Sequence, residues 1–510
     1  MEKKIYSLKD LSKKINLLKN KGKKIIHCHG VFDILHAGHI KHFHSAKKLG
    51  DILVVTLTQD QHVNKGPNRP IFPIDVRMQC VAALESVDFV ASNSSDNAVR
   101  AIKTLKPNIY CKGKDYINNK LDVTGQINQE GKAVKNVGGK IFYTNDELYS
   151  SSKIINTSGF SLSQEQKRFL DKLKVDKNFN DSSKISKVIN SFFDLKILVI
   201  GETIIDEYVF CETLGKSGKE PVLVLRDLYK EKYLGGAAAI ARNLSSFCKK
   251  ITLLSCIGEN KDQLSFIKKN LPQNVKKDFL AKKDSTTIVK TRFVDDVNKN
   301  KVLGVYSIND SPLNKKQSFN LNKRIIKEIK KHDLVIVSDY GHGFISSHAA
   351  KKIIKHSKFI AVNAQLNAAN IGHHTISNYI GANLVIINEN EMRHEMRNKN
   401  ESVEILIKKL TDKLKSQYTT VTSGNRGSKI FSRKTNKLLN CPAFATNVVD
   451  KVGTGDAMLA LLSIGIYKKT NINFSMLVSA LAAAMKIQFM GNSAHLKKTD
   501  IIKSLQAYLS

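Results

Sequence analysis

The stretch Gly30-Val-Phe-Asp-Ile-Leu-His-Ala-Gly-His39 decides the fold of the first part of the chain. A Lys-Ile-Ile run at 24–26 precedes it, a helical pattern of apolar residues follows from Ile40, and a second apolar run occupies 52–57. This order predicts a strand, a glycine turn, a helix start and a next parallel strand, the arrangement in which open α/β sheets bind nucleotides. The amino end of such a helix offers free amides and a positive dipole end to phosphate.

Six of the fifteen histidines fall between His27 and His44. His36 and His39 share one face of the first helical turn, where they can hydrogen-bond an α-phosphate while a nucleophile displaces pyrophosphate. Gly38 leaves room for a nucleotide against the backbone. A zinc site is the competing interpretation, but only Asp33 and Cys28 are near in sequence as further ligands, so nucleotidyl transfer is favoured. We expect His42 and His44 to be solvated helix positions without a role.

This segment resembles the cytidylyltransferase-like nucleotidyltransferases, whose motif runs Gly-x-Phe-Asp-x-x-His-x-Gly-His. Further stretches that match that family are Lys65-Gly66, Arg69-Pro70, Arg77, Lys112-Gly-Lys-Asp-Tyr116 and Ser150-Ser-Ser-Lys-Ile154. The resemblance implies catalytic roles for His36 and His39. It also implies a set of nucleotide-binding residues: Gly30, Phe32, Asp33, Gly38, Arg69, Lys112, Ser151 and Ser152.

A second motif lies near the C-terminus, in Asp450-Lys-Val-Gly-Thr-Gly-Asp456 followed by an apolar helical pattern. Two glycines before a helix allow consecutive amides to form an anion hole for a transferring phosphoryl group. Asp456 can take the proton of an attacking hydroxyl, although an aspartate at a helix start is also an ordinary cap.

The second motif resembles that of the ribokinase-like sugar kinases, with Thr454 in place of alanine. Other pieces of that family follow in order over roughly 195–505. The resemblance implies a substrate set of Asp206, Gly235 and Gly236. It implies an ATP-binding and anion-hole set of Thr422, Gly424, Gly453, Thr454 and Gly455. It implies Asn388 and Glu391 as the residues that organise Mg²⁺.

We therefore expect an α/β protein with two doubly wound domains, a Rossmann-like nucleotidyltransferase and a ribokinase-like kinase with a small β lid. The predicted limits are 1–160 for the transferase, 161–190 for a linker with one short helix, and 191–510 for the kinase. Strand-like segments at 207–225 and 285–308 are the basis for expecting the lid and a homodimer.

The pair of domains is similar to the bifunctional heptose-phosphate kinase and heptose-phosphate adenylyltransferase family, but in reversed order. That resemblance implies a sugar or sugar phosphate and ATP as substrates, Mg²⁺ as cofactor, and an ADP-heptose-like product, with CTP open as the nucleotide and a monovalent cation as a further cofactor. Two departures fall near the expected sugar: Ala239 replaces an asparagine, and Asn363-Ala-Gln365 replaces Asp-Pro-Lys. Two alternatives stay open, a CTP-dependent polyol-phosphate transferase fused to a polyol kinase and a transferase with a degenerate kinase half.

Composition limits the other classes. The formal net charge is +37 at pH 7, yet the lysines are spread over the whole length without a dense basic block, which favours biased composition over nucleic-acid binding. No apolar run approaches the roughly 20 residues needed to cross a bilayer, so we expect no membrane partner. Seven cysteines without paired spacing indicate reduced thiols, and we expect a cytoplasmic enzyme.

Overall fold

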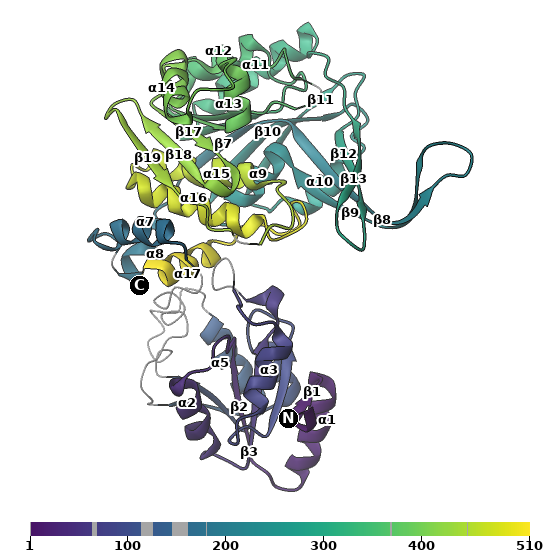
Figure 1. Ribbon diagram of the computed structural model, residues 1–510, viewed down its shortest axis with the longest axis vertical. Helices are drawn as coiled ribbons and strands as arrows, with labels where there is room; N and C mark the ends of the chain where they lie inside the picture. The colour runs from purple at the N-terminus through teal and green to yellow at the C-terminus, as the bar shows by residue number, and fades with distance from the viewer. Residues whose placement is uncertain are drawn as a thin grey trace. The chain divides into compact units, whose positions relative to one another are not determined.

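The computed structural model describes residues 2–63, 69–113, 126–144, 162–179, 181–367, 370–445 and 447–509. The chain divides into two compact units, one formed by Met1–Ser186 with Thr499–Ser510 and the other by Lys187–Lys498 (Figure 1). The terminal helix α17 (Lys498–Leu509) thus groups mostly with the first unit, where Gln506 hydrogen-bonds Ser182 and Ser186 of helix α8 (Ser182–Asn190). The predicted limits 1–160, 161–190 and 191–510 remain a prediction for the domains themselves.

The first unit contains a six-stranded parallel sheet in the order β1-β4-β3-β2-β5-β6. Strand β2 lies between β3 and β5. The chain therefore places β3 and β4 on one side of β2, and then β5 and β6 on the other side. The carboxyl ends of β2 and β5 therefore meet at the switch point of the sheet, where ligands bind in open α/β folds. The strands are β1 (Ile5–Tyr6), β2 (Ile25–Gly30), β3 (Ile52–Thr58), β4 (Phe89–Asn93), β5 (Ile109–Gly113) and β6 (Lys140–Thr144).

Helices cover both faces of this sheet. Phe43 and Ala46 of one helix and Val81 of another pack with Ile26 and Cys28 on one face. The other face carries separate clusters built on the remaining helices of the sheet domain. The first pair is α2 (Ala37–Lys47) and α3 (Ile74–Ala82), and the others are α1 (Leu8–Asn20), α4 (Val99–Leu105) and α5 (Gln126–Asn136).

The predicted linker contains more structure than expected. One short helix was predicted over 161–190, and the chain forms two, α7 (Gln164–Lys174) and α8. Phe169, Leu170 and Leu173 are buried in α7, as their spacing predicts. The second helix escaped prediction because its few apolar positions, Ile185, Val188 and Ile189, lie in a segment rich in serine and lysine.

The second unit combines a nine-stranded sheet with a separate four-stranded sheet. The large sheet has the order β11-β10-β7-β14-β15-β16-β17-β18-β19, and the small one has the order β13-β12-β8-β9. The large-sheet strands are β7 (Lys196–Gly201), β10 (Lys250–Gly258), β11 (Val275–Lys282), β14 (Leu334–Asp339), β15 (Ile360–Ala364), β16 (Leu384–Asn388), β17 (Tyr418–Thr422), β18 (Ser428–Ser432) and β19 (Lys437–Cys441).

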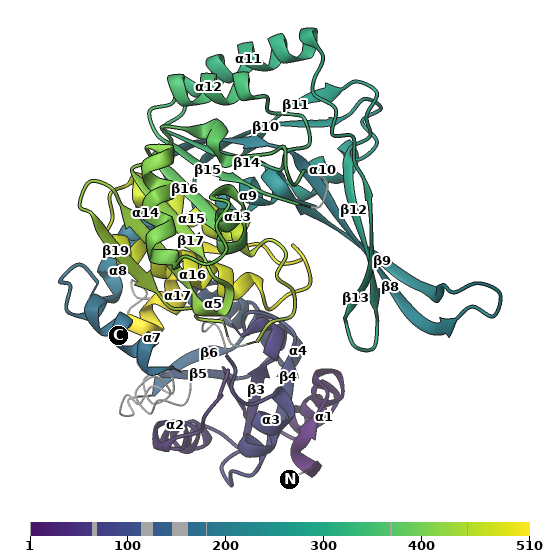
Figure 2. The ribbon, with the colours of Figure 1, turned by 45° about the horizontal axis from the view of Figure 1, so that its top comes forward.

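The small sheet is the lid expected from the segments 207–225 and 285–308. Its strands are β8 (Thr203–Lys216), β9 (Leu223–Gly235), β12 (Ile288–Asp295) and β13 (Lys301–Ser307). Figure 2 shows these strands leaving the body of the unit, with the end of the β8–β9 hairpin projecting furthest. We call these four strands the lid.

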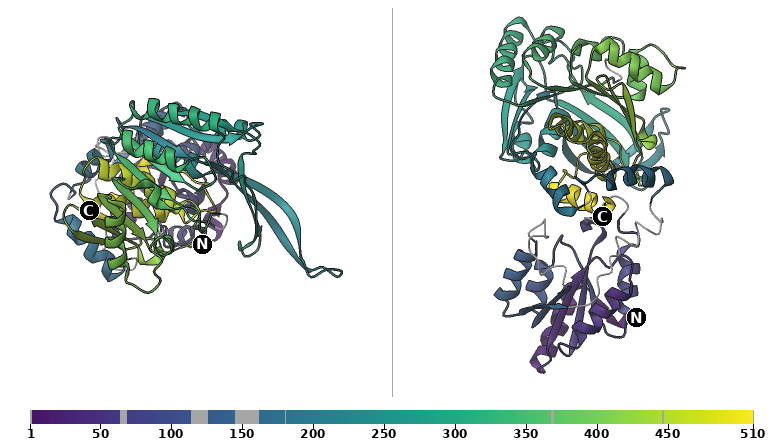
Figure 3. Two further views of the ribbon diagram at one scale, coloured as in Figure 1. Left: turned by 90° about the horizontal axis from the view of Figure 1, so that it is seen from above. Right: turned by 90° about the vertical axis from the view of Figure 1, so that its left-hand side faces the viewer.

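Helices flank the large sheet on both sides, as the two views in Figure 3 show. Apolar residues of α11, α12 and α14 join the main core with strands β7, β14 and β16. Among the described residues, no helix is both long and apolar enough to cross a membrane. The helices of this unit are α9 (Gly236–Leu244), α10 (Leu264–Asn270), α11 (Lys315–Ile329), α12 (Ser347–His356), α13 (Glu389–Glu395), α14 (Val403–Leu414), α15 (Thr454–Tyr467) and α16 (Ile472–Lys486).

Candidate functional sites

The two predicted catalytic histidines stand together where helix α2 begins. His36 is the N-cap residue, its carbonyl accepts the amides of His39 and Ile40, and the His36 and His39 rings stack with centroids 3.8 Å apart. Gly38 is buried in the same turn. The turn therefore brings two imidazoles and the amides of a helix start to the carboxyl end of β2, a geometry suited to an anion.

Asp33 and Arg69 are brought together by the fold, although 35 residues of sequence lie between them. The Arg69 Nε donates to Asp33 Oδ2 at 2.8 Å, and the amides of Ile71 and Phe72 donate to Oδ1 at 2.8 and 3.1 Å. Asp33 is thus a buried anchor for the segment after Arg69, a role that its sequence position did not indicate. Arg69 Nη2 has no hydrogen-bond partner among the described residues, which leaves a donor for an anion.

Gly30 makes room for a side chain of the same turn. A Cβ at Gly30 would lie 2.7 Å from the ring of Phe32, and Phe32 itself adopts a left-handed φ of 48°. The Phe32 ring packs edge-on against His39 and Phe43 at centroid distances of 5.3 and 5.0 Å. Both residues therefore shape the turn that presents His39.

The basic residues of this unit have different surroundings. Lys112, at the end of β5, lies 3.1 Å from Glu130. Arg77 is one of the residues that match the cytidylyltransferase-like family. Its side chain is buried and donates to the carbonyls of Val31 and Thr58 and to Asp60. Arg77 is therefore a structural residue that ties the turn after β2 to the end of β3. The predicted Ser151 and Ser152, with Lys65-Gly66 and 114–116, lie outside the described residues.

Two histidines of β2 are held neutral. His27 Nε2 and His29 Nδ1 lie 2.7 and 2.8 Å from the Thr56 hydroxyl. Burial lowers the pKa of each imidazole to about 3, and for His29 the neighbouring charge of Lys112 adds to the effect. These side chains are structural polar groups of the sheet, so the histidines near the motif do not form one functional set.

One of the two histidines expected to be solvated differs from that expectation. His44 is exposed, but His42 is partly buried, and its Nδ1 lies 2.9 Å from the Thr144 hydroxyl. The difference arises because strand β6, about 100 residues further on, packs beside α2, which the local pattern could not indicate.

In the second unit, Asp456 lies in the first turn of α15. The Tyr340 hydroxyl donates to its Oδ1 at 2.9 Å. Burial raises the Asp456 pKa to about 6 and the charge of Asp206 adds to this, while the Tyr340 hydrogen bond and the charges of Lys486 and Lys290 oppose it. A carboxylate with such a pKa is ionised at neutral pH and is still basic enough to accept a proton.

The glycine turn before Asp456 is fixed by steric constraints. Gly453 has a φ of +81°, and a Cβ there would lie 2.2 Å from Asn492 Oδ1. The Thr454 hydroxyl donates to the carbonyl of Lys451 at 2.9 Å, which closes the turn, and a Cβ at Gly455 would meet open space. The start of α15 is therefore open on the side of Gly455, and free amides at a helix start can stabilise a phosphoryl group.

The predicted substrate residues meet at the base of the lid. Asp206 Oδ1 accepts from Arg292 at 2.6 Å, and Asn492 Nδ2 lies 3.4 Å from Oδ2. A Cβ at Gly235 would lie 2.4 Å from Asp206 Oδ2, and one at Gly236 would lie 2.4 Å from the Glu202 carbonyl. The glycine pair therefore lets strand β9 pass beside the Asp206 carboxylate and turn into α9.

Sequence reasoning missed the cations of this site. Lys290 and Arg292 enter from lid strand β12, and Lys290 Nζ lies 5.4 Å from the centre of the Tyr340 ring. Lys486 of α16 is buried and donates to the carbonyl of Ala494. Burial lowers the Lys486 pKa to about 7, with the charge of Arg242 adding to the effect. No local motif surrounds these residues, so only the fold identifies them.

A buried carboxylate supports the segment that carries Tyr340. Glu202 accepts the amides of Tyr340 and His342 at 3.0 and 3.1 Å, and Asp339 accepts from the Tyr379 hydroxyl at 2.6 Å. Burial and the neighbouring charge of Asp339 raise the Glu202 pKa. Glu202 thus fixes the backbone from which Tyr340 reaches Asp456.

The residues predicted for magnesium form the start of α13. Asn388 Oδ1 accepts the Glu391 amide at 2.8 Å, and Glu391 Oε2 accepts the Asn388 amide at 3.0 Å, a reciprocal cap. Burial raises the Glu391 pKa to about 7. Asn388 and Glu391 therefore cap helix α13. Binding of Mg²⁺ would be a second role for the same pair.

The predicted adenine-side residues lie beside this cap. Thr422 ends β17, whose neighbour in the sheet is β16, and the exposed Gly424 has a φ of +58° in the turn that follows. The Ser423 hydroxyl donates to Glu389 of α13 at 2.8 Å, which joins the two segments. The carboxyl ends of adjacent strands thus bring Thr422 and Gly424, which the resemblance assigned to ATP, beside the pair that it assigned to Mg²⁺.

The two departures from the kinase pattern have local explanations. Ala239 is buried in α9. The Asn363 side chain donates to the carbonyl of Ile386 in the neighbouring strand at 2.9 Å. The Asn363 side chain therefore links the adjacent strands β15 and β16.

Comparison with known families agrees with this geometry. Residues 194–499 match the model of the pfkB family of carbohydrate kinases, and residues 27–157 match the cytidylyltransferase-like model. The first match covers more than half of the chain, so this chain belongs to the pfkB carbohydrate kinase family. Both matched families are transferase families, and the chain is an enzyme of the transferase class.

The curated relatives of the chain include bifunctional proteins named HldE. The chain is 28% identical over 300 residues to the bifunctional protein HldE of Campylobacter jejuni (strain RM1221), covering 58% of this chain and 62% of that protein. It is 44% identical over 141 residues to the bifunctional protein HldE of Campylobacter fetus subsp. fetus (strain 82-40), covering 27% of this chain and 30% of that protein. Each alignment spans less than two thirds of the relative.

Among solved structures, phosphofructokinase-2 from Escherichia coli in complex with potassium superimposes with a TM-score of 0.50 and 12% identity. The match covers 62% of this chain and 99% of that chain. At this identity the likeness supports the fold alone, and it confirms the expected ribokinase-like architecture.

Proposed function

We propose that this chain phosphorylates a sugar phosphate in its second unit and joins a sugar 1-phosphate to a nucleotide in its first unit, giving an ADP-heptose-like product. The observation that carries the proposal is the pairing of two reaction sites on one chain. One has stacked imidazoles at a helix start, and the other has a carboxylate with a raised pKa beside a glycine turn. The similarity to the HldE proteins supports the choice of sugar and nucleotide.

In the kinase step, Asp456 takes the proton from a substrate hydroxyl as that oxygen attacks the γ-phosphate of ATP. The amides at the start of α15 stabilise the charge on the transferring phosphoryl group. Tyr340 holds the carboxylate in position through its hydroxyl. Asp206, Gly235 and Gly236 form the sugar side of the site, and the adenine side is formed by Thr422 and Gly424.

The charge around the sugar side favours an anionic substrate. Lys290 and Arg292 both come from the lid; Arg292 forms an ion pair with Asp206, whose charge also raises the pKa of Lys290. Burial lowers the Lys290 pKa, so a bound phosphate would offset the cost of keeping this ammonium charged. A phosphorylated sugar therefore fits the site better than a neutral one.

In the transferase step, the sugar 1-phosphate oxygen attacks the α-phosphate of the nucleotide and pyrophosphate leaves. His36 and His39 donate hydrogen bonds to the phosphate oxygens as charge develops on them. The free Nη2 of Arg69 adds a further donor. Gly38 and Lys112 line the same switch point, and Ser151 and Ser152 are proposed as nucleotide ligands from resemblance alone.

Magnesium is the proposed cofactor of both steps. The donors at Asn388 and Glu391 are amide and carboxylate oxygens, which suit this ion, and Glu391 is fixed by the cap. They would hold Mg²⁺ through its water molecules, and the ion would neutralise phosphate charge. A monovalent cation in the kinase half is proposed only from the resemblance.

The lid supports the proposal of a homodimer. Strand β13 is exposed along its whole length, and several large apolar side chains lie exposed on the lid. A second copy covering them would remove this apolar area from water. The exposed apolar residues are Leu214, Leu223, Val224, Leu228, Tyr229, Val302, Leu303, Val305 and Tyr306.

A CTP-dependent enzyme for a small polyol phosphate remains the second candidate for the transferase half. The match to the cytidylyltransferase-like family supports this candidate. A degenerate kinase half is less favoured, because Asp456, Gly453, Gly455 and Glu391 are all present in one arrangement. The proposed substrates are metabolites of the cytoplasm, which is where we place the enzyme.

The test is incubation of the full chain with ATP or CTP and a panel of sugar and polyol phosphates, with products identified by mass. The proposal expects an ADP-sugar from a heptose phosphate and ATP. Formation of a CDP-polyol alone would establish the second candidate. Formation of nucleotide-sugar without sugar-dependent consumption of ATP would show that the kinase half is degenerate.

A further inference from the structure

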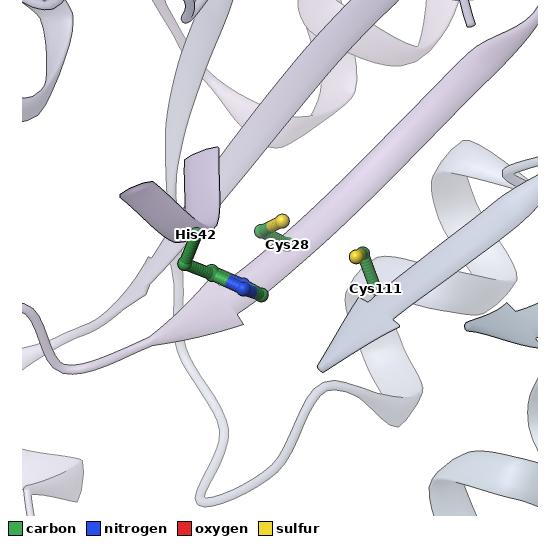
Figure 4. A group of neighbouring side chains, drawn as sticks. All are labelled: Cys28, His42 and Cys111. Carbon is green, nitrogen blue, oxygen red and sulfur yellow. The ribbon is translucent and has the colours of Figure 1, made fainter. Parts of the chain in front are cut away.

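Three side chains with metal-binding atoms meet between helix α2 and the sheet of the first unit. They are Cys28 of β2, His42 of α2 and Cys111 of β5, and Figure 4 shows them gathered around one space. Their ligand atoms all lie within 4.8 Å of one another. Cys28 and Cys111 are register partners on adjacent parallel strands, so the fold itself sets their separation.

The donor types select one class of ion. Two thiolates and an imidazole are the soft sulfur and nitrogen ligands that zinc takes in proteins, whereas Mg²⁺ takes oxygen ligands. With Zn–S of about 2.3 Å and Zn–N of about 2.0 Å, tetrahedral coordination places ligand atoms roughly 3.5–3.8 Å apart. The three atoms therefore need to approach one another by at most about 1.3 Å. Three protein ligands leave a fourth position for water or another donor.

A neighbouring hydroxyl is placed to orient the imidazole. His42 Nδ1 lies 2.9 Å from the hydroxyl of Thr144, a buried residue at the end of β6. Histidines that bind metals commonly donate their other ring N–H to an acceptor, which fixes the tautomer and the ring. Donation from Nδ1 to Thr144 assigns Nε2 to the metal.

The protonation of the thiols predicts how binding responds to pH. Burial raises the pKa of Cys28 well above its usual range, and its hydrogen bond with Cys111 adds to this. Zinc binds the thiolate form of cysteine, so each thiol must release its proton when the ion binds. Metal affinity should consequently rise with pH.

We infer that Cys28, His42 and Cys111 form a binding site for zinc or a closely similar ion, independent of the proposed enzymatic function. A bound ion would tie α2 to β2 and β5. The same helix carries His36 and His39 at its amino end, so the site would hold the nucleotide-binding turn against the sheet. Local sequence did not indicate the site, because Cys111 reaches it only through the pairing of β5 with β2.

The test uses the full chain without an affinity tag, stripped of metal by a chelator and titrated with Zn²⁺ against a chromogenic competitor. Titration with Co²⁺ gives a second readout, because thiolate ligands produce a charge-transfer absorption band. We expect one equivalent of either ion, a thiolate–Co²⁺ band and a higher melting temperature. Excess Mg²⁺ and ATP should leave the band unchanged.

Matched variants separate this site from other histidines and cysteines. Cys111→Ser and His42→Gln should lose the tight equivalent, and Thr144→Val should weaken it about 10–100-fold. Cys80→Ser and His44→Gln, which alter exposed residues of the same unit, should bind as the wild type does.

Three results would overturn the inference: no thiolate–Co²⁺ band in the wild type, an unchanged Zn²⁺ affinity in His42→Gln, or an equal loss in the Cys80→Ser control. His42 is only partly buried, so its variant tests the site even if Cys111→Ser fails to fold.

Discussion

Replacing Tyr340 by phenylalanine tests how the kinase base is tuned. The hydroxyl donates to Asp456 at 2.9 Å and stabilises the ionised carboxylate, which works against the rise of its pKa to about 6. A hydrogen bond to a charged group contributes about 1.5–3 kcal/mol, but water can replace part of it at this partly accessible carboxylate. A net loss of roughly 1.4 kcal/mol corresponds to about one pKa unit.

The variant should therefore move the Asp456 pKa from about 6 to roughly 7. Because only the ionised base accepts the proton, kinase activity rises with pH through this pKa and then levels off. At pH 6 the ionised fraction of Asp456 falls about fivefold in the variant, at pH 7 about twofold, and well above pH 8 hardly at all.

The assay is the kcat/KM of sugar-dependent ATP consumption between pH 5 and 9 for the wild type and Tyr340→Phe. Tyr467→Phe is the matched control, because Tyr467 ends the same helix α15 that Asp456 begins. A loss of activity that is equal at every pH would refute the tuning argument and leave Tyr340 a packing residue. An acidic limb that does not move would do the same.

The remaining predictions address the other functional elements. His39→Ala should lower nucleotide-sugar formation about 10²–10³-fold and leave ATP consumption by the kinase half unchanged, whereas loss of both in a folded protein would contradict separate sites. Arg292→Leu should raise the KM for a phosphorylated sugar more than that for its unphosphorylated form, as measured by steady-state kinetics, and equal effects on both would argue against a phosphate-binding lid. Leu303→Glu, on an exposed lid strand, should shift the protein from dimer to monomer in analytical ultracentrifugation, and an unchanged mass would place the proposed dimer contact elsewhere.

The fold was predictable where glycines and apolar runs occur together. The run before Gly30 and the helical pattern after it gave β2 and α2, and the turn before Asp456 gave the start of α15. These signals are local, because each depends on residues that are close together in the sequence. The lid strands were also expected from their sequence pattern, and the second linker helix was not.

The surroundings of the sites were less predictable because they depend on distant residues. The pairing of Asp33 with Arg69 and the approach of Lys486 to the kinase site depend on packing between separate elements. Tyr340 directly follows strand β14, but its bond to Asp456 joins residues 116 positions apart in the sequence. Resemblance supplied roles for individual residues, whereas the geometry supplied their partners.

The central claim is that one chain holds two independent sites for consecutive steps. The most direct test measures both half-reactions in full-length Asp456→Asn, which keeps the size and helix-capping ability of the side chain. We predict a loss of phosphoryl transfer of about 10²–10⁴-fold, with nucleotidyl transfer to a supplied sugar 1-phosphate at the wild-type rate. Retention of most kinase activity would show that Asp456 is only a helix cap, and loss of both activities in a folded protein would contradict two independent sites.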